Sequence, residues 1–259
     1  MLKRLKAISP PLIFVLALVF LSGCTTIYNP ATERRETLLI DTEGEVNLGS
    51  DMDKQLQNEL KILSEPQMQQ RLENIGQKVA SFSDRKDLIY HFRIVDDKEL
   101  NAFAIPGGYV YVNSGLINLA TDNELAGVLG HELGHIAARH SIKRLQTVLG
   151  YQLILGIALG LSGNTTMGQA IDIVFNLVNL GYSRKDEFLA DKLAVRYSKR
   201  AGYQPYAIVT FFEKLKKESE KKGPNFNLVF LSSHPPITER IKAVENEIKN
   251  VPSVSGSLQ

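Results

Sequence analysis

Cysteine is almost absent from this chain of 259 residues: Cys24 is the only one, so no disulfide can form within the chain. An excess of charge of one sign is lacking too. The formal charge is +2, and it becomes −1 without residues 1–23, which hold three basic and no acidic side chains. This balance gives no electrostatic reason to expect nucleic-acid binding. Since internal repeats and low-complexity segments are also missing, we expect one ordinary, well-buried domain, for which the length suffices.

Long hydrophobic runs are few. The run nearest the N-terminus covers residues 12–21, which is too short to cross the ~30 Å hydrocarbon core of a membrane as a stable helix. It follows three basic residues, Lys3, Arg4 and Lys6, an order typical of a secretory signal peptide. We therefore expect residues 1–23 to be a targeting segment that is removed.

The end of this run, Leu-Ser-Gly-Cys at residues 21–24, resembles the lipobox of bacterial lipoproteins. The resemblance implies that Cys24 is acylated and becomes the first residue of the mature chain, which would anchor the protein to a membrane. Thr25 follows, where inner-membrane retention uses aspartate, so the resemblance favours the outer membrane and the periplasmic side. The alternative is an ordinary signal peptide with an incidental cysteine.

The rest of the chain predicts an α+β fold that is mainly helical, with a small β-sheet. Polar residues without a clear period predict a tether over 24–50, followed by one domain over 51–250 and a flexible tail over 251–259. The expected helices cover 51–63, 65–82, 123–143, 184–201, 205–221 and 237–248, and the expected strands cover 89–95, 101–105 and 109–112. Pro-Gly-Gly at 106–108 predicts a turn between the last two strands.

Two apolar stretches, 148–161 and 170–180, lie between the predicted helices at 123–143 and 184–201. The length of the first is more typical of a buried or interfacial helix than of a membrane span. We interpret both as core helices, and the alternative is a lid or a membrane-touching hairpin that gates a cleft.

Residues 131–135 read His-Glu-Leu-Gly-His and fall within the strongest helix candidate. Residues four apart lie about 40° apart around a helix, so His131 and His135 can both reach one metal ion. Glu132 is offset by about 100°, which suits a general base acting on water that zinc has acidified. The alternative, two surface histidines, fits poorly because apolar residues occupy most of this helix.

A zinc enzyme of this kind needs a third protein ligand. His140 lies about 180° around the same predicted helix from His131, so we interpret it as structural, with a hydrogen bond at the helix C-terminus. Glu187 and Asp191 are four apart on a later predicted helix and share a face. One carboxylate could bind the metal while the other accepts the free N–H of a ligating histidine. A solvated face, or an ion pair with the basic residues at 184–185, is the alternative.

These motifs together resemble the gluzincin metallopeptidases of the HtpX, BepA and CAAX prenyl protease superfamily. Three further segments match: 101–108 resembles the family's cleft edge, 138–141 the end of its zinc helix, and 233–235 with Arg240 its C-terminal His-Pro motif. The likeness covers roughly residues 50–250. The multi-spanning helices of the HtpX and prenyl protease branches are missing, so the resemblance favours the periplasmic lipoprotein or soluble branch.

The resemblance implies a zincin-like metallopeptidase domain that holds one Zn²⁺ per chain. His131, His135 and Glu187 would be the metal ligands, and Asp191 would be the partner of a ligating side chain. Other divalent ions can occupy such a site, but two imidazoles and a carboxylate suit zinc best.

Further site residues follow from the same resemblance. Glu132 would be the catalytic base. His234 would lie near the zinc and either stabilise the oxyanion or occupy the open metal position at rest, and Arg240 would act similarly on substrate carbonyls, with loop packing as the alternative for both. The cleft edge would bind substrate through a short strand, which could pair with an extended peptide. Its residues are Asn101, Ala102, Phe103 and Ala104.

The expected function is zinc-dependent endopeptidase activity on unfolded or misassembled cell-envelope proteins, as a form of protein quality control. The alternative is a non-proteolytic chaperone or assembly factor for outer-membrane proteins that uses the same cleft. The expected partners are the unfolded substrates and a membrane, through the lipid on Cys24, with the outer-membrane assembly machinery as a further candidate.

Overall fold

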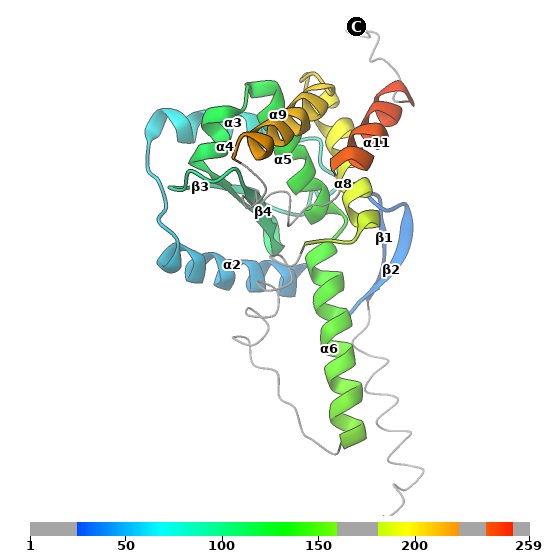
Figure 1. The fold of residues 1–259 in the computed structure, drawn as a ribbon. Helices are drawn as coiled ribbons and strands as arrows, with labels where there is room; N and C mark the ends of the chain where they lie inside the picture. Colours follow the sequence, from blue (N-terminus) through cyan, green and yellow to red (C-terminus); the bar gives the residue numbers. More distant parts are fainter. Residues whose placement is uncertain (1–24, 160–180, 223–236, 251–259) are drawn as a thin grey trace, which may run out of the picture.

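The computed structural model describes residues 25–159, 181–222 and 237–250 (Figure 1). Several predictions concern segments outside these ranges: the signal segment 1–23, Cys24, the apolar stretch 170–180, His234 and the tail 251–259. In the described ranges, none of the helices combines the length and the apolar character that a membrane crossing requires.

The predicted irregular tether over 24–50 is wrong for the part of it that the structure describes. Thr25–Asn29 (β1) and Arg34–Leu38 (β2) form an antiparallel hairpin, and Thr42–Glu59 (α2) follows. The Asp41 side chain caps α2 by accepting a hydrogen bond from the Gly44 N–H at 2.8 Å. Part of the polar character of this segment comes from Glu45, which occupies a buried position of α2 and is neutralised by ion pairs with Arg85 and Arg139. The folded body therefore begins well before residue 51.

The small sheet has three strands in the order β3-β5-β4. His91–Val95 (β3) runs parallel to the central Tyr109–Asn113 (β5), and Ala102–Ile105 (β4) pairs antiparallel with the other side of β5. A 3₁₀ turn at Pro106–Gly108 joins β4 to β5, and both of its glycines have positive φ, 80° and 99°. The predicted strands and turn are confirmed.

The helices form the rest of the domain and pack around one central helix. Asp122–Ala137 (α5) is buried along almost its whole length and packs against the sheet strand β4 and against four other helices (Figure 1). Thr121 caps it in a capping box with Glu124. The other helices are Pro66–Ala80 (α3), Ser114–Leu119 (α4), His140–Leu159 (α6), Arg184–Arg200 (α8), Ala207–Lys222 (α9) and Ile237–Asn250 (α11).

The single helix predicted over 123–143 is wrong, because α5 ends at Ala137 and α6 starts at His140. Arg139 between them has φ 56°, a left-handed conformation that costs a non-glycine residue about 1–2 kcal/mol. Its guanidinium is held by the buried carboxylate of Glu45 and by the Thr42 hydroxyl, both on α2. The break thus depends on residues nearly a hundred positions away, and no glycine or proline marks it in the sequence.

The packing of α2 on the β4–β5 turn can be tested at Gly49. A Cβ atom there would lie 2.0 Å from the Pro106 carbonyl oxygen, so we expect Gly49→Ala to lower the free energy of unfolding by ~1–3 kcal/mol. Gly150→Ala is the matched control, since a Cβ atom in that helix meets nothing within 4 Å and should be neutral or stabilising. Urea denaturation measures both. An unchanged midpoint for Gly49→Ala would show that α2 is detached from the domain.

Candidate metal centre

The candidate site lies where α5 crosses α8, and small residues bring the two helices close together. A Cβ atom on Gly134 would lie 3.0 Å from the Cα of Ala190, and one on Gly130 would lie 3.1 Å from the Cα of Ala194. Glycine on one helix and alanine on the other therefore allow the backbones to approach. The α8 N-terminus is fixed by a capping box, one turn before the residues that face α5.

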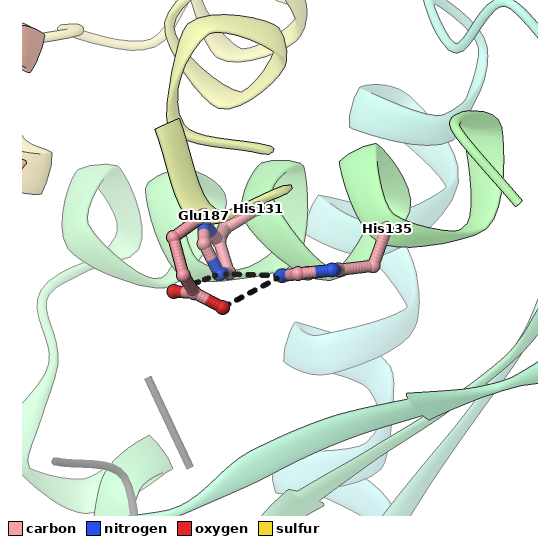
Figure 2. Close-up of side chains that lie close together, drawn as sticks. All are labelled: His131, His135 and Glu187. Atoms are coloured by element: carbon pink, nitrogen blue, oxygen red, sulfur yellow. Dashed lines mark hydrogen bonds and ion pairs between the residues drawn. The ribbon is translucent and has the colours of Figure 1, made fainter. Parts of the chain in front are cut away.

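Three side chains converge at this crossing. Figure 2 shows His131 and His135 of α5 and Glu187 of α8 pointing toward one another, and all three are buried. The two imidazole Nε2 atoms are 3.0 Å apart, and the Glu187 oxygens lie 3.5 Å from His135 Nε2 and 3.6 Å from His131 Nε2. Tetrahedral bonds of ~2.1 Å place ligand atoms ~3.4 Å apart. The three donors therefore fit a metal ion of zinc's size.

Asp191 lies one turn beyond Glu187 on α8 and fixes the orientation of the His131 ring. Its Oδ1 is 2.9 Å from His131 Nδ1, so the proton belongs on Nδ1 and the lone pair of Nε2 faces Glu187. Burial, followed by the charge of Arg240, lowers the pKa of His131 and keeps the ring neutral. Burial opposes ionisation of Asp191, but the charge and hydrogen bonds of Arg240 outweigh it and lower the pKa of Asp191 to about 2.

Arg240 belongs to α11 and is fully buried. Its Nη1 lies 3.0 Å from a Glu187 oxygen, and its Nε and Nη2 donate to the two oxygens of Asp191 at 2.8 and 2.7 Å. Phe212 covers the guanidinium, with 4.5 Å between the cation and the ring centroid. The prediction placed Arg240 near the metal, and the structure brings it there. Its guanidinium binds the two carboxylates, and the expected action on substrate carbonyls stays a prediction.

Glu132 is fully buried on α5, between the two histidines in sequence. Burial raises the pKa of Tyr182, and the charge of Glu132 contributes to that rise. Among the described residues, the group able to share a metal ion contains both histidines and Glu187 but not Glu132. Glu132 therefore adds a carboxylate beside the three donors without being one of them.

Two residues at this site were missed by sequence reasoning. Because the chain turns at Arg139, His140 returns toward the metal group, and its Nδ1 lies 2.9 Å from Nδ1 of His135. Tyr182, just before α8, stacks on the His135 ring with 4.0 Å between the centroids, and its hydroxyl pairs with that of Ser141 at 2.7 Å. The interpretation of His140 as a structural residue assumed an unbroken helix, and no local signal marks Tyr182.

The predicted substrate segment forms the start of β4 and the residue before it. The Asn113 N–H donates to the Asn101 carbonyl at 2.9 Å, which makes these two residues a hydrogen-bonded pair. Since such pairs alternate along an antiparallel ladder, the main-chain groups of Ala102 and Ala104 point away from β5. Of the strands in the described ranges, only β5 pairs with β4, so these groups lie on a side of β4 that has no strand partner there, although Ala102 and Ala104 are themselves buried.

Comparisons with known proteins agree with this arrangement. Residues 66–248 match the model of peptidase family M48. The chain is 31% identical over 161 residues to "Metalloprotease LoiP" of Escherichia coli (strain K12), covering 61% of this chain and 62% of that protein. It is 32% identical over 161 residues to "Metalloprotease YcaL" of the same strain, with the same coverage.

A third relative, "Putative beta-barrel assembly-enhancing protease" of Vibrio cholerae, is 27% identical over 234 residues, covering 83% of this chain and 46% of that protein. The chain thus spans less than two-thirds of the length of each of these relatives. The resemblance drawn from the sequence motifs is confirmed, as is a mainly helical α+β fold with small sheets. The chain belongs to peptidase family M48.

Proposed function

We propose that the protein is a zinc-dependent endopeptidase that cleaves unfolded or misassembled proteins of the bacterial cell envelope. The observation that carries the proposal is the convergence of His131, His135 and Glu187 on one buried point, with Glu132 buried next to His131 on the same helix. A ligand set of two imidazoles and one carboxylate, completed by an open position, is characteristic of catalytic zinc. Bound zinc would act as a Lewis acid that acidifies water and polarises a carbonyl group.

Three residues of the chain would carry out the other functions of the site. Glu132 takes a proton from the attacking water and passes it to the nitrogen of the leaving amine. Asp191 keeps the proton of His131 on Nδ1, which leaves Nε2 free to bind metal. Arg240 offsets the charges of the buried Glu187 and Asp191, and it lowers the pKa of Asp191.

β5 is the only strand in the described ranges that pairs with β4, which supports binding of an extended substrate on the other side of β4. The outward main-chain groups of Ala102 and Ala104, which are buried in this structure, would become accessible and pair with a peptide that adds as a further strand. Pairing of this kind recognises backbone rather than particular side chains, and a folded protein offers few free extended segments. We therefore propose that the enzyme acts on unfolded chains.

The cellular setting is part of the same proposal. The Leu-Ser-Gly-Cys sequence supports lipidation at Cys24 and an outer-membrane anchor that faces the periplasm. Relatives named for β-barrel assembly support a client among outer-membrane proteins and a link to their assembly machinery. The same names favour a second candidate function, in which the cleft holds clients during assembly without cutting them.

Substitution of Glu132 separates the two functions. We expect Glu132→Gln to keep one zinc ion per chain but to lower the hydrolysis of unfolded casein by ~10²–10⁴-fold, because the general base is lost. Glu213→Gln, at an exposed position on α9, is the matched control and should cleave like the unaltered protein. Metal analysis and a casein assay give the readouts. Full hydrolysis by Glu132→Gln would contradict the assigned base, and zinc binding without hydrolysis by the unaltered protein would favour the holding role.

The preference for unfolded substrates can be tested with one protein in two states. A small disulfide-bonded protein should resist cleavage when native and be cut after reduction and alkylation, because only then does it offer extended segments to β4. Gel analysis of both digests measures the difference. Equal cleavage of the two states would contradict recognition through an unfolded backbone.

The role of Arg240 can be tested without substrate. We expect Arg240→Met to lower the free energy of unfolding of the metal-free protein by ~3–5 kcal/mol, because two buried carboxylates lose their cation. Saturating zinc should restore part of this loss. The control is Arg184→Met, whose exposed pair with Glu239 contributes ~0–1 kcal/mol. If Arg240→Met kept full stability but lost catalytic rate, the guanidinium would be acting on substrate instead.

A further inference from the structure

Two side chains outside the metal-binding group also contact the ring of His135. Its Nε2 atom faces His131 and Glu187, whereas its Nδ1 atom lies 2.9 Å from Nδ1 of His140. The ring of Tyr182 covers one face of His135 at a centroid distance of 4.0 Å. A partner for the second nitrogen of a ligating histidine fixes both its tautomer and its orientation.

The direction of the His135–His140 hydrogen bond follows from metal binding. A neutral imidazole that binds a metal through Nε2 carries its proton on Nδ1, so His135 must be the donor and His140 Nδ1 the acceptor. The proton of a neutral His140 then belongs on Nε2. That atom lies 3.4 Å from Oδ1 of Asp186, an ion-pair contact that is longer than the 2.9 Å contact between Asp191 and His131.

The two metal-binding histidines are thus supported differently. His131 meets the carboxylate of Asp191 directly at 2.9 Å, whereas His135 reaches the carboxylate of Asp186 through the ring of His140. Asp186 also belongs to the capping box of α8, where it pairs with Ser183. One carboxylate therefore serves both the helix that carries Glu187 and the orientation of a histidine on α5.

The backbone turn at Arg139 brings His140 into contact with His135. An unbroken helix would put residues 135 and 140 about 140° apart around its axis, so their rings would point in different directions. The ion pair between Arg139 and Glu45 stabilises the left-handed residue that returns His140 toward His135. His140 is itself buried and lies outside the group able to share a metal, because its Nδ1 faces His135.

We propose that His140 is a positioning residue which accepts the Nδ1 proton of His135, under the control of Asp186, and thereby sets the metal affinity of the site. The inference rests on the proposed function in taking zinc as the ion that the site binds. It does not depend on which substrate the enzyme cleaves.

Two substitutions of His140 separate a hydrogen-bond role from space filling. His140→Phe keeps a ring but has no acceptor, and we expect the dissociation constant for zinc to rise ~10–100-fold. His140→Asn keeps an acceptor near the position of Nδ1 and should rescue most of the affinity. His91→Phe is the matched control, because His91 lies on β3 and stacks on Tyr109.

The measurements use the full chain and no substrate. Competition with a chromophoric chelator gives the zinc dissociation constant, and the visible spectrum of the cobalt-substituted protein reports the ligand geometry. We expect a changed spectrum for His140→Phe alone. Zinc affinity and spectrum unchanged in His140→Phe would overturn the proposal, and so would an equal loss of affinity in His140→Phe and His140→Asn.

A second variant keeps the test decisive if His140→Phe does not fold. Asp186→Asn occupies a half-buried position and retains a side chain able to cap α8, so it should fold. We expect its zinc affinity to fall between those of the unaltered protein and His140→Phe, and an unchanged affinity would overturn the proposal. An unaltered protein that binds zinc without cleaving casein would contradict the proposed function alone, whereas one that binds no zinc would contradict both.

Discussion

The backbones of α5 and α8 approach closely because Gly130 and Gly134 face Ala194 and Ala190, and the metal centre depends on this crossing. A larger side chain at either glycine would meet backbone atoms, which cannot move aside as the end of a flexible side chain can. Only at this separation do the imidazoles of α5 and the carboxylate of Glu187 come within 3.5–3.6 Å of one another. The packing of two helices thus sets the ligand spacing.

The same crossing buries charges that water would otherwise stabilise. Glu187 and Asp191 are both removed from solvent, and the free-energy cost of such burial is large unless the charges are paired. Arg240 provides that pairing from α11, with bidentate contacts to Asp191 and one contact to Glu187. A bound metal ion would add a second positive charge beside Glu187. The site is therefore arranged so that an acid remains ionised while the neighbouring histidine remains neutral.

The N-terminal part of the described chain also helps to position the metal-binding helix. Glu45 on α2 pairs with Arg139, and Asn29 next to the hairpin turn donates to the carbonyl of Ala137 at the end of α5. These contacts fix the place where the metal-binding helix ends and α6 begins. Residues that the sequence alone describes as a polar tether therefore determine where His140 lies.

The sequence by itself determined that His131 and His135 share one helix face and that Glu187 and Asp191 share another, because these spacings depend only on the pitch of a helix. The choice of Glu187 as the third metal ligand came from the family resemblance. The sequence also determined the strands and the Pro-Gly-Gly turn, through local alternation and the conformational freedom of glycine. Only the tertiary structure decided that the helix breaks at Arg139, that Arg240 binds carboxylates and that His140 supports His135. The physical reason is that each of these features rests on buried ion pairs or hydrogen bonds involving side chains from separate helices, which local periodicity does not encode.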